Sequence, residues 1–155
     1  MSKLHTTLVA LALLCPLSAC DSPDDEGSEA PRAVEDFNDG MSCDSDAGAF
    51  RVTLWSDTGD LEVGQNNLVV RIGMHNPNNP EDQGTGIPNA DIDLDAWMPA
   101  ANSSMANEPL VEYLGDGQYR LENVVLPEQG VWNFDFEVVV GENMYETVSL
   151  AFAID

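Results

Sequence analysis

Apolar and polar residues alternate along most of the chain from Phe50 onward, in short runs that are separated by turn residues. A period of two is typical of β-strands with one buried face. The pattern predicts strands at residues 50–56, 66–75, 91–98, 109–114, 118–126, 131–140 and 144–154. No helical period of comparable strength competes with it. The alternation therefore predicts an all-β domain.

Turn residues between the runs support these boundaries. Gly115-Asp116-Gly117 suits a tight hairpin, residues 127–130 run from a proline to a glycine, and residues 141–143 suit a second hairpin. About seven antiparallel strands with this spacing are typical of an immunoglobulin-like β-sandwich. We assign residues 49–155 to such a domain.

The alternation also predicts which side chains face the core. Inward positions of the last two strands hold large apolar residues, namely Trp132, Phe134, Phe136, Val138, Val148, Leu150, Phe152 and Ile154. By the same parity Met98 and Met74 are each the last inward residue of a strand. Trp55 and Trp97 fall on outward positions, so they would mark a partner surface if they are exposed.

The first 20 residues are typical of a secretory signal. Lys3 and His5 precede an apolar run at residues 8–14, which is too short to span a bilayer. The run ends in Leu17-Ser18-Ala19-Cys20, which resembles the lipobox of bacterial lipoproteins, in which the cysteine is lipidated and becomes the first mature residue. The resemblance implies a lipid anchor at Cys20 and an extracytoplasmic protein, facing the periplasm or the cell surface. An ordinary signal peptide with a chance cysteine is the alternative.

Residues 21–48 are acidic and poor in large apolar side chains. Such a segment cannot bury enough surface to offset chain entropy, and its like charges keep it extended. We therefore predict a disordered tether over residues 21–48 that holds the domain away from the membrane.

The charge narrows the choice of partner. The chain has 28 Asp and Glu against 5 Lys and Arg, and removal of residues 1–20 takes the only lysine, so the mature charge is 4 − 28 = −24. Nucleic acid is excluded because it binds proteins through cations that replace its counterions. Electrostatic adhesion to anionic lipid is disfavoured for the same reason. A cationic protein, a metal ion or a role in solubility remains as an explanation of the charge.

The inventory of reactive side chains argues against an enzyme. After processing, the chain keeps one histidine, His75, and one cysteine besides the anchor, Cys43. Ser-His-Asp, Cys-His and lysine-based nucleophiles therefore lack their parts, and no glycine-rich phosphate loop occurs. Cys43 cannot form an internal disulfide; an incidental thiol, an intermolecular bridge and a metal ligand are the alternatives.

Five short motifs follow one another along the predicted domain: Val63-Gly64-Gln65-Asn66 with Leu68 and Val70, Pro88-Asn89-Ala90-Asp91-Ile92, Met98-Pro99, Gly115-Asp116-Gly117-Gln118-Tyr119, and Gly130-Val131-Trp132. In this order they resemble the YtkA-like domain family, which is related to FixH-type proteins. The resemblance covers residues 50–155 and implies an extracytoplasmic immunoglobulin-like module of a group linked to copper handling or oxidase assembly. In that family a stretch rich in methionine and histidine commonly follows Met-Pro, whereas residues 100–105 read AANSSM here.

Methionine, histidine and cysteine are side chains that suit Cu(I), and the mature chain offers two groups of them. The first candidate site is Met98 with Met105. The second, at the opposite pole of the sandwich, consists of Met41, Cys43, Met74, His75 and Met144. Met98 lies about 26 Å along its strand from the pole of His75, so the two groups cannot share one ion.

A row of acidic residues suggests a third candidate site, for calcium. Asp91-Ile92-Asp93-Leu94-Asp95 resembles the start of a calcium loop, but an EF-hand requires glycine and glutamate where Ala96 and Asn102 stand. A strand whose aspartates face solvent explains this segment without a ligand. Weak calcium binding by the acidic strand face remains a minor alternative.

The leading hypothesis is a lipid-anchored envelope binding or accessory module without catalytic activity. Its predicted contacts are the membrane, through the N-terminal lipid, and an unidentified envelope protein. No cofactor is required by this hypothesis. A copper-binding or copper-delivery protein is the alternative.

Overall fold

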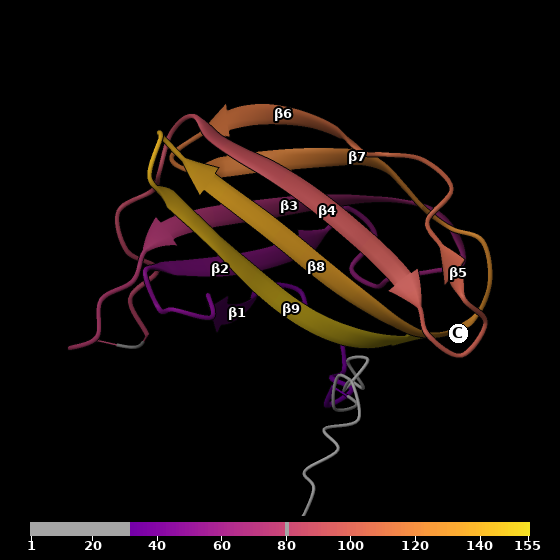
Figure 1. Cartoon of the computed structure of the whole chain (residues 1–155). Helices are drawn as coiled ribbons and strands as arrows, with labels where there is room; N and C mark the ends of the chain where they lie inside the picture. Colours follow the sequence, from indigo (N-terminus) through magenta and orange to yellow (C-terminus); the bar gives the residue numbers. More distant parts are fainter. Residues whose placement is uncertain (1–31, 80) are drawn as a thin grey trace, which may run out of the picture. The chain divides into compact units, whose positions relative to one another are not determined.

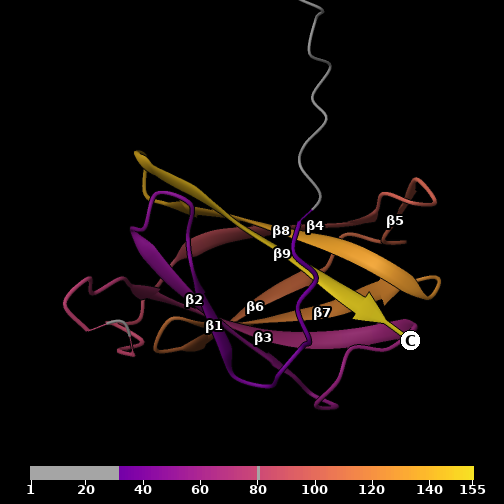
Figure 2. The ribbon, with the colours of Figure 1, turned by 90° about the horizontal axis from the view of Figure 1, so that it is seen from below.

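The computed structural model describes residues 32–79 and 81–155, and within them nine strands form two antiparallel sheets (Figure 1). One sheet has the order β1 (Met41–Asp44), β2 (Phe50–Ser56), β3 (Gly64–Met74), β7 (Gln118–Leu126) and β6 (Leu110–Gly115). The other has the order β5 (Ser103–Ser104), β4 (Ala90–Met98), β8 (Gly130–Val140) and β9 (Met144–Ile154). The sheets lie over one another as two layers (Figure 2), which confirms the predicted all-β sandwich.

The predicted strands agree closely with the observed ones. Strands β2, β7 and β9 have the predicted bounds, and the pairing of β6 with β7 and of β8 with β9 confirms the two hairpins. Strand β3 begins two residues before the prediction, with a bulge between Asn66 and Leu68. Asn66 is buried there, where its amide donates to the Glu62 carbonyl over 2.8 Å and accepts from the Glu62 N–H over 2.9 Å. The buried polar side chain near the start of β3 therefore has hydrogen-bond partners within the fold.

The core lies between the two sheets and contains the residues that the alternation selected. Trp132, Phe134 and Phe136 are fully buried, and the ring of Phe134 meets that of Phe152 at 5.2 Å in an edge-on contact. Tyr119 crosses the core from β7: its hydroxyl donates to the Ile87 carbonyl over 2.7 Å and accepts from the Ala90 N–H over 2.8 Å. This pair of bonds fixes the point at which β4 begins.

The structure corrects the predicted tether over its second half, because residues 32–44 belong to the folded domain. We call this segment the strap. The Glu35 N–H donates to the Ala151 carbonyl over 2.8 Å beside a parallel bridge to Phe152 of β9, and β1 then pairs with β2. The prediction failed here because backbone pairing and a few apolar side chains hold the strap, and composition does not reveal either. The signal sequence, Cys20 and the first part of the tether lie outside the described residues.

The two long sides of the sandwich differ. On one side the strap bridges β9, the last strand of its sheet, and β2 of the facing sheet. On the other side lie β6, a sheet edge, and β4, which β5 covers only at Trp97 and Met98. From Asp91 to Asp95, β4 thus has no strand partner on its outer edge among the described residues. We call the free edges of β4 and β6, with residues 104–108 between them, the open side.

Helices long and apolar enough to cross a bilayer are absent from the part of the chain that the structure describes.

Candidate functional site

The first candidate metal pair, Met98 and Met105, lies on the inner face of the four-stranded sheet. Met98 is 4% exposed. Its sulfur atom packs so closely on Gly130 that a Cβ atom at position 130 would collide with it. The Met105 N–H donates to the Ala96 carbonyl over 2.8 Å, which extends the pairing of β5 with β4 by one residue. Met105 therefore faces inward, diagonally across from Met98, and packs against the core. Both methionines thus have a structural role.

The groove beside Met105 offers it only hard donors. The groove has a volume of about 520 Å³, and Asp93, Asp95, Glu108 and Glu137 line it together with Met105. Carboxylates suit magnesium, calcium and manganese, whereas Cu(I) prefers sulfur and imidazole. The donor set at Met105 does not fit a soft metal.

At the second candidate site, one ring nitrogen of the histidine, Nδ1, contacts a carboxylate. His75 Nδ1 lies 2.9 Å from Asp44 Oδ1, and Arg51 donates to both oxygens of the same carboxylate over 2.8 Å and 3.0 Å. The hydrogen bond from Arg51 is the main reason why the pKa of Asp44 lies below its ordinary value. Met41 pairs opposite Leu54, three residues along β1 from Asp44, and so lies away from the histidine.

The sulfur groups of the second candidate site are dispersed. Burial raises the pKa of the Cys43 thiol to about 12, with the carboxylates of Glu35 and Asp44 adding to the effect. The thiol is therefore protonated at neutral pH, whereas a metal binds the thiolate. Met74, predicted inward, is 45% exposed, because β3 ends there and the core series stops at the fully buried Ile72. Met144 is exposed as well.

His, Cys, Asp and Glu side chains form no group of three or more that is placed to hold a metal ion anywhere in residues 32–79 and 81–155.

The acidic row of β4 faces outward, as the alternation predicted. Ile92 and Leu94 are buried, whereas the three aspartates that alternate with them, at positions 91, 93 and 95, are exposed. The register sets Asp93 opposite Glu137 and Asp95 opposite Asp135, and like charges in these positions repel. Weak calcium binding by this face stays a prediction.

The strap forms an ion pair with Asp135, which lies opposite Asp95 on the same outer face. The Asp135 carboxylate accepts hydrogen bonds from Arg32 Nη1 over 2.7 Å, from Ser149 Oγ over 2.6 Å and from Trp97 Nε1 over 3.2 Å. The strap is thereby tied to the outer face of the sheet. Asp93 and Glu137 line the groove beside the open side.

The two tryptophans proposed as a partner surface are half-buried. Trp55 lies under the strap, against Gly40, and Trp97 is held by Asp135. Large apolar side chains are exposed instead along β6, where Leu110 is 63% exposed and Val111 and Tyr113 are 45% and 44% exposed. The sequence carries a signal that we did not use: residues 110–114 read LVEYL, with apolar residues at both parities, so one face had to be left uncovered.

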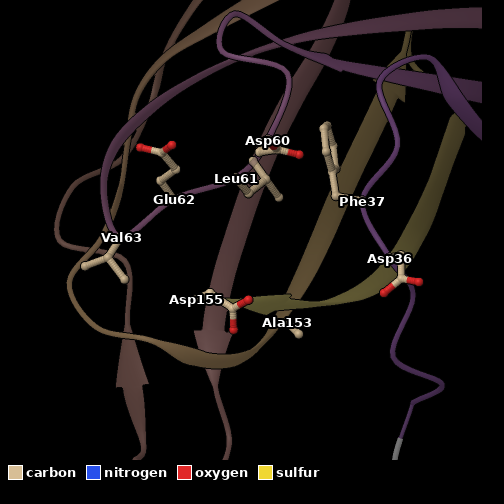
Figure 3. Close-up of a pocket in the computed structure, with 8 residues that line it drawn as sticks. All are labelled: Asp36, Phe37, Asp60, Leu61, Glu62, Val63, Ala153 and Asp155. Carbon is tan, nitrogen blue, oxygen red and sulfur yellow. The ribbon is translucent and has the colours of Figure 1, made fainter.

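A cavity of about 580 Å³ lies where the strap passes the β2–β3 connection and the end of β9 (Figure 3). Its apolar lining consists of Phe37, Leu61, Val63 and Ala153. The carboxylates of Asp36, Asp60 and Asp155 are spread around the rim and do not converge on one point. The cavity brings together neither a nucleophile with a base nor a set of metal ligands.

Comparison with known proteins agrees with the fold. The family described as YtkA-like matches residues 45–137. A copper-bound variant of FetP from uropathogenic Escherichia coli has 12% identity and a TM-score of 0.52, over 77% of this chain and 97% of that chain. FetP as isolated after expression in the periplasm of Escherichia coli has 13% identity and a TM-score of 0.50, over 78% and 97%.

No curated protein matches the chain. At 12% and 13% identity, the likeness to FetP shows the fold alone. The family match spans more than half of the sequence and includes the Met-Pro and glycine motifs. The chain therefore belongs to the YtkA-like family.

Proposed function

We propose that the protein is a lipid-anchored binding module of the cell envelope, without catalytic activity, and that its partner docks on the open side of the sandwich. The observation that carries the proposal is the asymmetry of the two sides. The strap covers one side; on the other, the outer edge of β4 from Asp91 to Asp95 has no strand partner among the described residues, and β6 exposes Leu110, Val111 and Tyr113. Unpaired sheet edges and clustered exposed apolar side chains are surfaces that other chains bind.

The predicted anchor is compatible with this docking side. The first described residue, Arg32, is bonded to Asp135 on the outer face of the four-stranded sheet, so the chain enters the domain at that face and not along the free edges of β4 and β6. Acylation of Cys20 supports stable retention, since more than one acyl chain exceeds the threshold for lasting membrane binding. We expect Cys20→Ala to move the protein from the membrane to the soluble fraction. Retention of that variant in washed membranes would show that the lipobox is not the anchor.

A charge placed on β6 is expected to disrupt the complex with the partner. Val111→Glu puts a carboxylate into the apolar surface of β6, and we expect the protein in detergent-solubilised envelopes to shift from a larger species to its free size in native electrophoresis. Val131→Glu is the matched control, because Val131 is 40% exposed against 45% for Val111 but lies on the outer face of β8. Equal behaviour of the two variants would contradict docking on the open side.

Copper binding is the second candidate, and the fold shared with copper-bound FetP favours it. In this chain Met98 and Met105 supply two thioethers, fewer than the three or four soft ligands of a tight copper site. We expect that titration with Cu(I) under reducing conditions shows no stoichiometric binding below the micromolar range. Binding in that range that is lost in Met105→Leu, but kept in His75→Ala, would establish the copper function instead.

A further inference from the structure

Two adjoining grooves of about 520 Å³ and 290 Å³ run along the unpaired edge of β4. They share Asp93, Glu108 and Glu137, so they form one continuous depression, which we call the β4 groove. Ile92 and Leu94 of β4 line it but are themselves buried, so most of its accessible surface is polar. Its rim consists of carboxylates.

The β4 groove has the length of a short strand. The outer edge of β4 is free from Asp91 to Asp95, which are about 13 Å apart at strand rise. The hydrogen bond from the Ala90 N–H to the Tyr119 hydroxyl closes one end of the groove. The hydrogen bond from the Met105 N–H to the Ala96 carbonyl closes the other end. Between these ends every second residue of β4 directs its N–H and C=O away from β8, as in any edge strand.

The side chains along β4 define what such an added strand must carry. Residues of the added strand that face the core would meet Ile92, Leu94 and Met105, and these positions favour apolar side chains. Residues that face outward would meet Asp93, Glu108 and Glu137, and these positions favour lysine or arginine. Apolar and basic residues would therefore alternate over about five positions.

We propose that the β4 groove binds an extended segment of a partner protein in which apolar and basic residues alternate, and that this segment pairs with β4 as an additional strand. The inference rests on the proposed function and names the partner's chemistry. Charge complementarity selects this occupant over two others. A second copy carries the same charge of −24 after processing, and the chain's own residues 21–31 are acidic, so both would be repelled by the carboxylate rim.

The test uses the full-length protein in neutral detergent and a capped, fluorescently labelled nine-residue peptide in which lysine and valine alternate. We expect saturable binding by fluorescence anisotropy, and protection from hydrogen exchange of those amides between Asp91 and Asp95 that point away from β8. Asp93→Asn should weaken binding about two- to fivefold, as is typical of one exposed ion pair. Glu142→Gln, an exposed carboxylate in the β8–β9 turn, is the matched control and should leave binding unchanged.

Two further peptides separate strand pairing from simple charge attraction. One is N-methylated at its valine amides and the other at its lysine amides, and both keep the charge of the parent. In a paired strand only one of these sets of amides faces β4, so we expect one methylated peptide to lose binding and the other to keep it. Equal binding of both, or an equal effect of Glu142→Gln and Asp93→Asn, would overturn the inference. If no peptide binds while Val111→Glu still disrupts the native complex, the inference fails and the proposed function stands.

Discussion

Replacing Met98 by alanine is expected to lower the free energy of unfolding by about 2–5 kcal/mol, with or without copper in the buffer. The side chain is 4% exposed and fills the space beside Gly130, so its truncation leaves a cavity at the end of β4. Met98→Leu keeps most of the volume and should cost less than about 1.5 kcal/mol. Urea denaturation followed by tryptophan fluorescence measures both values.

The control for Met98 is a methionine outside the core. Met144 is exposed at the start of β9, so Met144→Ala should change the free energy of unfolding by no more than about 0.5 kcal/mol. If Met98→Leu proves as damaging as Met98→Ala, the sulfur atom itself matters and the structural role assigned to Met98 is wrong.

Removal of the Tyr119 hydroxyl should destabilise the start of β4. Tyr119→Phe leaves the Ile87 carbonyl and the Ala90 N–H without their partner, and we expect a loss of about 1–3 kcal/mol in the free energy of unfolding. Because these bonds close one end of the β4 groove, amides near Ala90 should also exchange with solvent faster than in the wild type. Denaturation and hydrogen exchange measure the two effects.

Tyr113→Phe is the matched variant for Tyr119→Phe. The two rings contact each other at 5.0 Å between centroids, but Tyr113 is 44% exposed on β6. Its hydroxyl should therefore contribute no more than about 0.5 kcal/mol. Similar losses in the two variants would mean that the bonds from Tyr119 to residues 87 and 90 do not hold β4 in place.

Much of the fold could be predicted because burial repeats with the strand period. The alternation placed Trp132, Phe134 and Phe136 in the core and the aspartates of β4 outside, and both predictions are confirmed. The alternation also placed Met98 in the core. This placement removed the main argument for a metal-binding loop directly after β4. Met74 shows the limit of this reasoning, since parity gives a direction but not the point at which the core ends.

The remaining features depend on which strands are neighbours. The strap pairs through its backbone with β9 and β2, and neither contact has a pattern in an acidic sequence. The open side follows from the strand order of two sheets and from the shortness of β5. Residues 110–114 carried apolar side chains at both parities, but only the topology shows that β6 is an edge.

Site-specific photocrosslinking in intact envelopes tests the docking side most directly. A benzoylphenylalanine replaces Tyr113 on β6 in one variant and Tyr145 on β9 in the other, two positions that are 44% and 58% exposed in the native chain. We expect a discrete crosslinked species from position 113 and none from position 145. Crosslinking from position 145 alone, or from neither position, would contradict a binding module that works through its open side.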